Sequence, residues 1–167
     1  MSSILKVDQI QLANGSTPTA GDLGLNVSGS VVQVIRGSNS SFTSLSTTGT
    51  WVDASCSATI TPTSSSNKIL VVASEAIYGD TDGDNQSEYG EYRLLRDSSA
   101  IWTSNSSMLS RGGQTPFINS TFSYLDTPAT TSAVTYKTQF NRSASGNRSV
   151  RMNAWGNANI ILMEIAG

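Results

Sequence analysis

The sequence from residue 117 to residue 140 reads FINSTFSYL, DTPATTSA and VTYKTQF, three consecutive pieces with different patterns. In the first and third pieces apolar and polar side chains largely alternate, which is the two-residue period of a β-strand. The middle piece begins with Asp-Thr-Pro-Ala at 126–129, residues that favour a turn. The stretch therefore predicts β-strands at 117–125 and 134–140, separated by a turn.

Similar segments occur throughout residues 31–167. Those typical of strands are 31–35, 42–52, 57–61, 69–73, 91–95, 101–102, 150–154 and 160–165. Turn-forming residues interrupt them, and no segment has the i, i+3, i+4, i+7 apolar period of a helix. The runs 69–73 and 160–165 are almost wholly apolar, which predicts strands that are covered on both faces or lie at a subunit interface. We therefore expect an all-β, jelly-roll-like antiparallel β-sandwich.

Composition supports the same fold class. Ser, Thr and Asn fill 59 of the 167 positions, while only 13% of the residues are charged. Helical proteins are rich in Ala, Glu, Lys and Leu, whereas short polar residues suit strands joined by turns. The net charge of −2 offers no basic excess for binding phosphates, and no apolar run approaches the roughly 20 residues of a membrane-spanning helix. We expect neither nucleic-acid binding nor membrane insertion.

The chain has no histidine and a single cysteine, Cys56. Histidine is the commonest general base and zinc ligand, so its absence argues against most enzyme classes. Glycoside hydrolysis needs only carboxylates and stays open, with Glu88 and Glu91 or Asp80 and Asp84 as the pairs. We expect a protein that is not an enzyme and has no catalytic residues, with Cys56 as a buried small side chain rather than a reactive thiol.

The first 30 residues differ from the rest of the chain. A short apolar stretch is followed by turn-forming and glycine-rich sequence, which is too little to form a core alone. We expect residues 1–30 to be an extended attachment segment and residues 31–167 to be the sandwich domain. The start of the chain has no apolar signal-peptide region, which favours synthesis in a cytoplasm. The apolar side chains expected to contact a neighbouring protein are Leu5, Val7, Ile10 and Leu12.

The most acidic segment runs from residue 80 to residue 91 and has the donor spacing of an EF-hand calcium loop. Loop positions 1, 3, 5, 9 and 12 are Asp80, Asp82, Asp84, Glu88 and Glu91. Calcium prefers several hard oxygen ligands around one point, which alternating carboxylates in a tight turn supply. Position 6 is Asn85 instead of glycine, and no helical pattern flanks the loop. Two interpretations stay open: a calcium site, with no other cofactor, or a solvated acidic hairpin loop.

Three Trp and five Tyr side chains suggest glycan binding as one use of the surface. Aromatic faces stack on the apolar faces of sugar rings while Asn, Ser and Asp bind the hydroxyls, and the alternative is ordinary core packing. Tyr89 and Trp102 lie beside polar loops, so they are the predicted glycan-binding residues. Trp51 and Trp155 are predicted to lie in the core.

Several segments resemble small tail-fibre-type proteins of tailed bacteriophages, especially phages of cyanobacteria and other aquatic bacteria. The early ones are LKVDQIQ at 5–11, ANG at 13–15 and DLGLNVSGSV at 22–31. The later ones are ITP at 60–62, SNKILV at 66–71, RLLRD at 93–97, YLDTP at 124–128 and LMEI at 162–165. The resemblance implies a particle component without catalytic residues, whose compact β domain is trimeric.

On this basis we expect a homotrimeric tail-fibre or appendage subunit of a phage virion that contributes to host attachment. It would be made in the cytoplasm of the bacterial host, and its partners would be copies of itself, other phage structural proteins and a host surface glycan. Leu5, Val7, Ile10 and Leu12 would then attach it to the virion. Two alternatives stay open: a capsid decoration (cement) protein that stabilises the head, and a bacterial carbohydrate-binding module.

Overall fold

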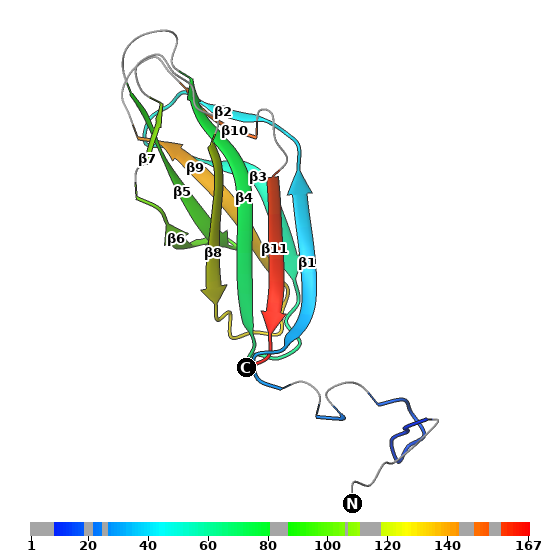
Figure 1. Cartoon of the computed structure of the whole chain (residues 1–167). Helices are drawn as coiled ribbons and strands as arrows, with labels where there is room; N and C mark the ends of the chain where they lie inside the picture. The colour runs from blue at the N-terminus through cyan, green and yellow to red at the C-terminus, as the bar shows by residue number, and fades with distance from the viewer. Residues whose placement is uncertain are drawn as a thin grey trace, which may run out of the picture.

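Figure 1 shows the computed structural model of the chain, in which two antiparallel sheets pack face to face. The structure describes residues 9–18, 22–24, 27–80, 87–105, 107–110, 118–143, 149–153 and 158–167. Within these ranges the regular elements are all strands, and nothing forms a helix able to cross a membrane. The strands are β1 (Val31–Asn39), β2 (Thr43–Leu45), β3 (Trp51–Ile60), β4 (Lys68–Asp80), β5 (Glu88–Arg96), β6 (Ser99–Thr103), β7 (Ser107–Ser110), β8 (Ile118–Asp126), β9 (Val134–Arg142), β10 (Ser149–Met152) and β11 (Ala158–Ile165).

The first sheet, sheet A, has the order β1-β11-β4-β10-β2, and β8 also pairs with β4. Along one edge of β4, β11 pairs with residues 68–74 and β10 pairs with residues 77–80. β1 and β2 in turn pair with β11 and β10. β1 and β2 therefore lie in line and occupy one strand position that is interrupted once. β10 and β11 occupy another in the same way. Sheet A has four positions, in the order β1/β2, β10/β11, β4 and β8.

Sheet B has the order β3-β9-β5, and both β6 and β7 pair with the other edge of β5. Counting β6/β7 as one interrupted position gives four positions in this sheet too. Numbered along the chain, the eight positions lie in the orders 1-8-3-6 and 2-7-4-5. This arrangement of eight strands in two sheets is that of a jelly roll. The predicted jelly-roll-like antiparallel sandwich is confirmed.

The core lies between the sheets and is built from alternate residues of each strand. In β4 the inward residues Ile69, Val71 and Ala73 are fully buried, as the two-residue period requires. Between β6 and β8 the rings of Trp102 and Phe122 stack, with centroids 4.6 Å apart and planes 11° apart. Both rings pack against the two buried apolar clusters, so this pair joins them.

A buried carboxylate organises the end of the sandwich that holds the C-terminus. Glu164 of β11 accepts hydrogen bonds at 2.6 Å from the backbone N–H of Thr63 and from the amide of Asn67, and another from Gln33. Burial alone would raise the pKa of Glu164, but the bonds from Asn67, Gln33 and Thr63 outweigh it, so the pKa lies below its ordinary value. The ionised group ties the loop between β3 and β4 to sheet A.

Two features of the strands differ from the sequence prediction. Residues 42–52 form β2, a turn and the start of β3 instead of one strand. Gly49 lies in this turn with φ +76°, a conformation that glycine adopts without strain, and its N–H donates to the carbonyl of Arg142 at 3.0 Å. The short strand β7 has no predicted counterpart. β4 continues well past residue 73 because β8 pairs with it up to residue 77 and β10 pairs with residues 77–80.

The described residues before β1 form no strand and leave the sandwich at the end where the C-terminus lies (Figure 1). Backbone hydrogen bonds link Gly29 and Ser30 to Ala166, at 2.8 and 2.9 Å, so the base of the segment is fixed to the sandwich. Farther out, Ile10, Leu23 and Val27 are exposed. The assignment of residues 1–30 as an attachment segment stays a prediction.

Candidate functional site

The outer face of sheet A carries an apolar row that crosses all four strand positions. Val34 of β1 pairs with Met163 of β11, Met163 with Leu70 of β4, and Leu70 with Leu125 of β8. Val34 is 55% exposed and Leu125 is 52% exposed. Since their strand neighbours point into the core, these four side chains face away from sheet B.

The apolar character continues to both sides of this row and then stops. Ile165 and the 53% exposed Val31 form the next pair toward the termini. Ile161 and Val72 form the next pair in the other direction. The row beyond them is polar: Ser38, Asn159, Ser74 and Thr121. The apolar region therefore covers the half of sheet A nearer the C-terminus.

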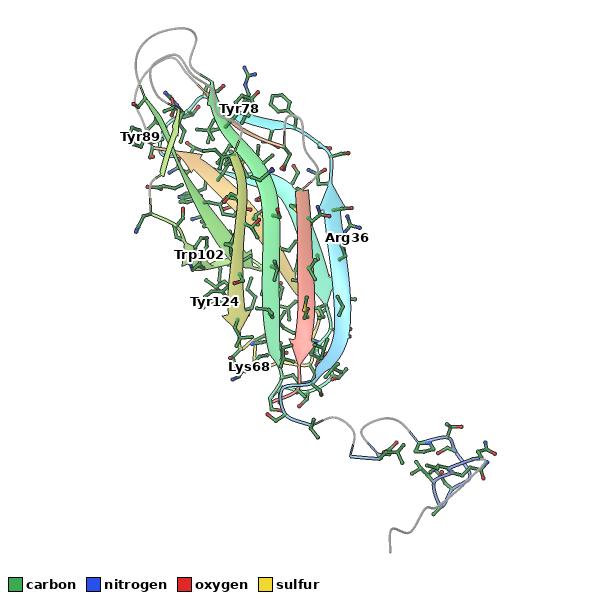
Figure 2. The ribbon with its side chains drawn as sticks, viewed as in Figure 1. Arg36, Lys68, Tyr78, Tyr89, Trp102 and Tyr124 are labelled. Carbon is green, nitrogen blue, oxygen red and sulfur yellow. The ribbon has the colours of Figure 1, made fainter. Side chains whose placement is uncertain are left out.

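We define this apolar face by Val31, Val34, Leu70, Val72, Leu125, Ile161, Met163 and Ile165. Eight positions at ordinary strand spacings give roughly 260 Å². Contiguous apolar patches of a few hundred Å² on soluble proteins are often interaction sites. Figure 2 shows Arg36 and Lys68 at its border, and no described element lies over it. The apolar runs 69–73 and 160–165 thus bury one side in the core and leave the other side without a cover among the described residues.

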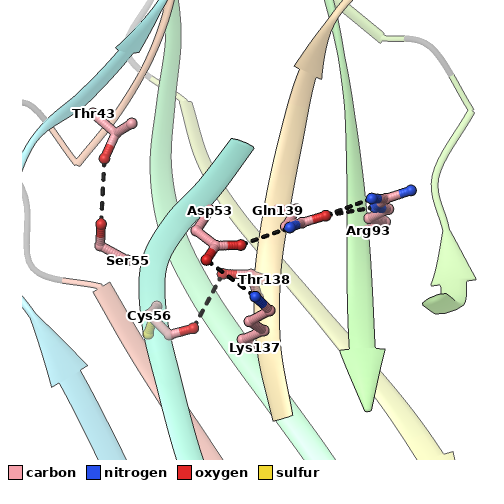
Figure 3. A network of polar contacts seen from close by, with 8 residues as sticks. All are labelled: Thr43, Asp53, Ser55, Cys56, Arg93, Lys137, Thr138 and Gln139. Atoms are coloured by element: carbon pink, nitrogen blue, oxygen red, sulfur yellow. Dashed lines mark hydrogen bonds and ion pairs between the residues drawn. The ribbon is translucent and has the colours of Figure 1, made fainter. Parts of the chain in front are cut away.

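The outer face of sheet B is different, because a chain of polar contacts crosses three of its strands (Figure 3). Asp53 of β3 accepts hydrogen bonds from Gln139 of β9 at 2.6 Å and from Lys137 at 3.0 Å. Gln139 in turn accepts a hydrogen bond from Nε of Arg93 on β5 at 2.8 Å. Partial burial would raise the pKa of Asp53, but the bonds from Gln139 and Lys137 outweigh it and hold the pKa below its ordinary value.

Two aromatic side chains border this polar chain. The guanidinium of Arg93 lies 4.2 Å from the ring centroid of Trp51, a cation–π contact. Trp51 pairs with Asn141, and Asn141 pairs with Glu91, to which its amide donates at 3.2 Å. Two residues before Glu91 on the same face of β5, Tyr89 is 37% exposed. We call these residues, with Asp53, Lys137 and Gln139, the polar–aromatic face.

A β-bulge shapes one side of the polar–aromatic face. The four-residue step from Asp53 to Ser57 on β3 faces a two-residue step on β9, and Ser55 within it has φ +63°. The bulge borders a hollow of about 80 Å³. Its lining residues are Asp53, Ser55, Cys56, Ser57, Lys137 and Thr138.

Thr138, which lines this hollow, contacts a buried carboxyl group, Glu75 of β4. Its Oε1 accepts a hydrogen bond from Thr138 at 3.0 Å, while its Oε2 has no partner among the described residues. Burial raises the pKa of Glu75 to about 8, so the group is largely protonated at neutral pH. Burial, with the nearby Glu75, also raises the pKa of the Cys56 thiol to about 12. Cys56 is therefore a buried side chain without thiolate character, as predicted.

The structure separates two residues of the predicted calcium site. Both oxygens of Glu88 accept hydrogen bonds from Arg142, at 2.9 and 3.0 Å, inside the end of the sandwich. Glu91 points to the outer face of sheet B, since the two residues are three positions apart on one strand. Asp80 ends β4, and Asp82 and Asp84 lie outside the described residues. In the described part of the chain no three metal-ligating side chains cluster, so calcium binding stays a prediction.

The predicted glycan-binding residues have different surroundings. Tyr89 projects from the end of β5 and is exposed (Figure 2), whereas Trp102 is half-buried against Phe122. The assignment of Trp51 to the core is wrong, because Trp51 shares its face of β3 with exposed Asp53 and lies outside both buried clusters. Trp155 lies outside the described residues.

Of the residues predicted to attach the chain to a virion, Leu5 and Val7 lie outside the described residues. Ile10 is 50% exposed and Leu12 is partly exposed. Ile10 is thus available to another molecule.

Comparisons with known proteins give no family. No family model and no curated protein matches the chain. Among solved structures, a chain of infectious bursal disease virus Gx strain aligns at 13% identity and a TM-score of 0.45, covering 83% of this chain. The VP2 subviral particle of the same virus aligns at 15% identity and a TM-score of 0.40. This chain spans 39% of the length of each of those chains, and our fold assignment rests on the strand order alone.

Proposed function

We propose that this chain is a non-enzymatic structural subunit of a bacteriophage virion. In this proposal it assembles as a homotrimer into a tail fibre or similar appendage and contributes to host attachment. The apolar face of sheet A is the observation that carries the self-assembly. The sequence resemblance of residues 5–31 and of the later core segments supports the assignment to a phage appendage.

The apolar face suits contact with a second copy of the chain for an energetic reason. Each Å² of apolar surface removed from water contributes about 25 cal/mol, so leaving this face in water forgoes several kcal/mol. Its roughly 260 Å² is about a third of the roughly 800 Å² that each partner buries in a stable interface. The face would therefore be the apolar centre of a larger contact, with the polar rows of the same sheet at its rim.

Light scattering of the purified full chain tests the assembly. We expect a mass of three chains of 17.6 kDa. Val34→Glu and Leu125→Lys place a charge in the apolar face at exposed positions, so both should shift the mass toward the monomer. Thr59→Lys, at an exposed position on the outer face of sheet B, is the control and should leave the trimer intact. A monomeric parent protein at micromolar concentration would refute the homotrimer.

Immunogold labelling of purified phage particles, combined with the copy number from quantitative mass spectrometry, tests the location. Label on the tail supports the appendage subunit. Label over the head, with a high copy number, would instead identify the chain as a capsid decoration protein. Particles without label would refute a virion role altogether.

A further inference from the structure

We propose that the polar–aromatic face of sheet B binds a neutral saccharide. The inference rests on the proposed function and deepens it, because it names the class of host-surface ligand. It replaces the predicted pair Tyr89 and Trp102 with a site made of Trp51, Tyr89 and the polar side chains between them.

The first argument is the combination of side chains. Trp51, Asn141 and Glu91 form one row across three adjacent strands, so the backbones of Trp51 and Glu91 are about 10 Å apart. Tyr89 stands at the end of this row on the same face. The exposed ring of Tyr89 provides a surface for the C–H face of a sugar, and Glu91 and Arg93 provide hydrogen bonds for its hydroxyls. Trp51 lies under the guanidinium of Arg93 and Asn141 is buried, so these two side chains hold Arg93 and Glu91 in place.

The second argument is that the polar groups are already oriented. Gln139 is held on both sides, by Asp53 and by Arg93, and Arg93 is held against Trp51. Some capacity remains: Oε1 of Glu91 and Nη1 of Arg93 make no hydrogen bond to a described residue. A ligand hydroxyl can donate to the first group and accept from the second. Binding to preoriented groups loses less conformational entropy, which favours weak ligands such as sugars.

The third argument concerns charge. The face holds two carboxylates, Asp53 and Glu91, and two cations, Arg93 and Lys137, so its formal charges cancel. Lys137 is paired with Asp53, and the guanidinium of Arg93 is engaged by Gln139 and Trp51. An anionic polymer would need unpaired cations, whereas neutral hydroxyls need the mixed donors and acceptors found here.

The fourth argument concerns placement. The two outer faces of a sandwich point in opposite directions, so an assembly built through the apolar face of sheet A directs sheet B outward. A trimer would then present three copies of the polar–aromatic face, and several weak sites acting together bind a surface far more tightly than one.

Saturation-transfer NMR on the full chain in its own oligomeric state tests the site. The neutral probes are methyl glycosides of glucose, galactose, mannose, rhamnose, fucose and the two common N-acetylhexosamines. The anionic probes are glucuronic acid and N-acetylneuraminic acid. We expect saturation transfer to at least one neutral probe. Transfer to no probe, or to anionic probes only, overturns the proposal.

If a neutral sugar binds, substitutions in the polar–aromatic face test whether it binds there. Tyr89→Ala should weaken binding about tenfold, the loss expected when a stacking ring is removed. Trp51→Ala should also weaken binding, because it removes the ring that holds the guanidinium of Arg93. Glu91→Gln keeps the shape of the side chain and should also weaken binding, so it decides the outcome if an alanine variant fails to fold. Ser123→Ala, on the outer face of sheet A, is the matched control and should bind like the parent. Binding that survives all three changes overturns the site.

This result is separate from the test of the proposed function. Particle labelling without sugar binding would leave a virion subunit that attaches by other means. Sugar binding by a chain that is absent from particles would instead favour a carbohydrate-binding module.

Discussion

At the scale of single residues, a fully buried ion pair joins two strands of sheet B. Arg142 and Glu88 are 1% and 0% exposed and make two hydrogen bonds to each other. Arg142 also donates to the carbonyl of Ser46 at 2.9 Å, which holds the turn before β3. Removing one partner of such a pair leaves a buried charge without compensation.

We therefore expect Arg142→Met to lower the free energy of unfolding by about 3–5 kcal/mol. The control is Lys137→Met, which breaks the exposed ion pair with Asp53 and should cost less than about 1 kcal/mol. Urea denaturation of the three proteins at pH 7 measures both values. Equal losses of unfolding free energy in the two variants would mean that burial does not make the Arg142–Glu88 pair more costly to break than an exposed ion pair.

Glu75 predicts how stability depends on pH. Its pKa is raised from 4.5 to about 8 in the folded protein by burial, so the folded state keeps a proton that the unfolded state releases. The stabilisation is complete below pH 4.5, falls as the pH rises toward 8, and is lost above it. The neighbouring groups are Thr138, Asn153 and Cys56, whose thiol stays protonated in this range.

The chain has no histidine, so few other groups titrate between pH 5 and 8. We expect the free energy of unfolding to fall across this range by up to about 1.4 kcal/mol per pH unit, and Glu75→Gln to remove most of that slope. Urea denaturation at pH 5, 6.5 and 8 checks it. A slope that persists in the variant would assign the pH dependence to another group.

At the scale of elements, β1 and β3 approach each other closely at Gly37, on one side of the sandwich. A Cβ atom on Gly37 would overlap the backbone carbonyl of Ser57 and crowd Ile160. Neither backbone can withdraw without breaking pairs with β11 or β9. We expect Gly37→Ala to destabilise the fold by about 1–3 kcal/mol, because the added methyl overpacks the contact. The measurement is the melting temperature of Gly37→Ala, with Ser38→Ala on the same strand as the control. Equal melting temperatures for the two variants would show that β1 and β3 can move apart to accommodate the methyl group.

The loop between β4 and β5 carries the calcium prediction. If Asp80, Asp82 and Asp84 bind calcium, the ion stabilises the folded state by mass action, so millimolar calcium should raise the melting temperature and chelation should lower it. Asp82→Asn with Asp84→Asn should remove the effect. Because Glu88 is held by Arg142, Glu88→Gln should lower the stability with or without calcium. If neither calcium nor the chelator changes the melting temperature, the acidic segment is a solvated loop and not a calcium site.

The strands themselves were largely predictable from sequence, whereas their partners were not. Two-residue alternation identifies β8 and β9 because each has one face in the core and one outside. The order of the sheets depends on pairs such as β1 with β11, which join opposite ends of the domain and leave no local signal. Trp51 was assigned to the core because core packing is the commoner role of an aromatic residue in a strand, although the apolar residues of β3 occupy the other face. The apolar runs 69–73 and 160–165 predicted either a cover on both faces or a subunit interface, and the described residues cover only the inner face of sheet A.

At the scale of the whole molecule, the described residues before β1 lie apart from the core of the sandwich. The described residues before β1 contribute nothing to the two buried clusters, while Gly29 and Ser30 bond to Ala166. We expect that deleting residues 1–27 leaves the melting temperature of the sandwich within about 2 °C, since little packed surface is lost. The same deletion should abolish incorporation into phage particles, because Leu5, Val7, Ile10 and Leu12 are the residues proposed to attach the chain.

Complementation of a phage that lacks the gene for this chain measures both effects in one preparation. Ile10→Ser with Leu12→Ser in the full chain is the finer test, since it changes two side chains without shortening the segment. Both proteins should fold and be absent from purified particles, whereas Leu23→Ser, exposed but outside the attachment set, should be incorporated. Incorporation of the deletion variant at the parent level would move the attachment function to the sandwich, where the apolar face of sheet A is the next surface to test.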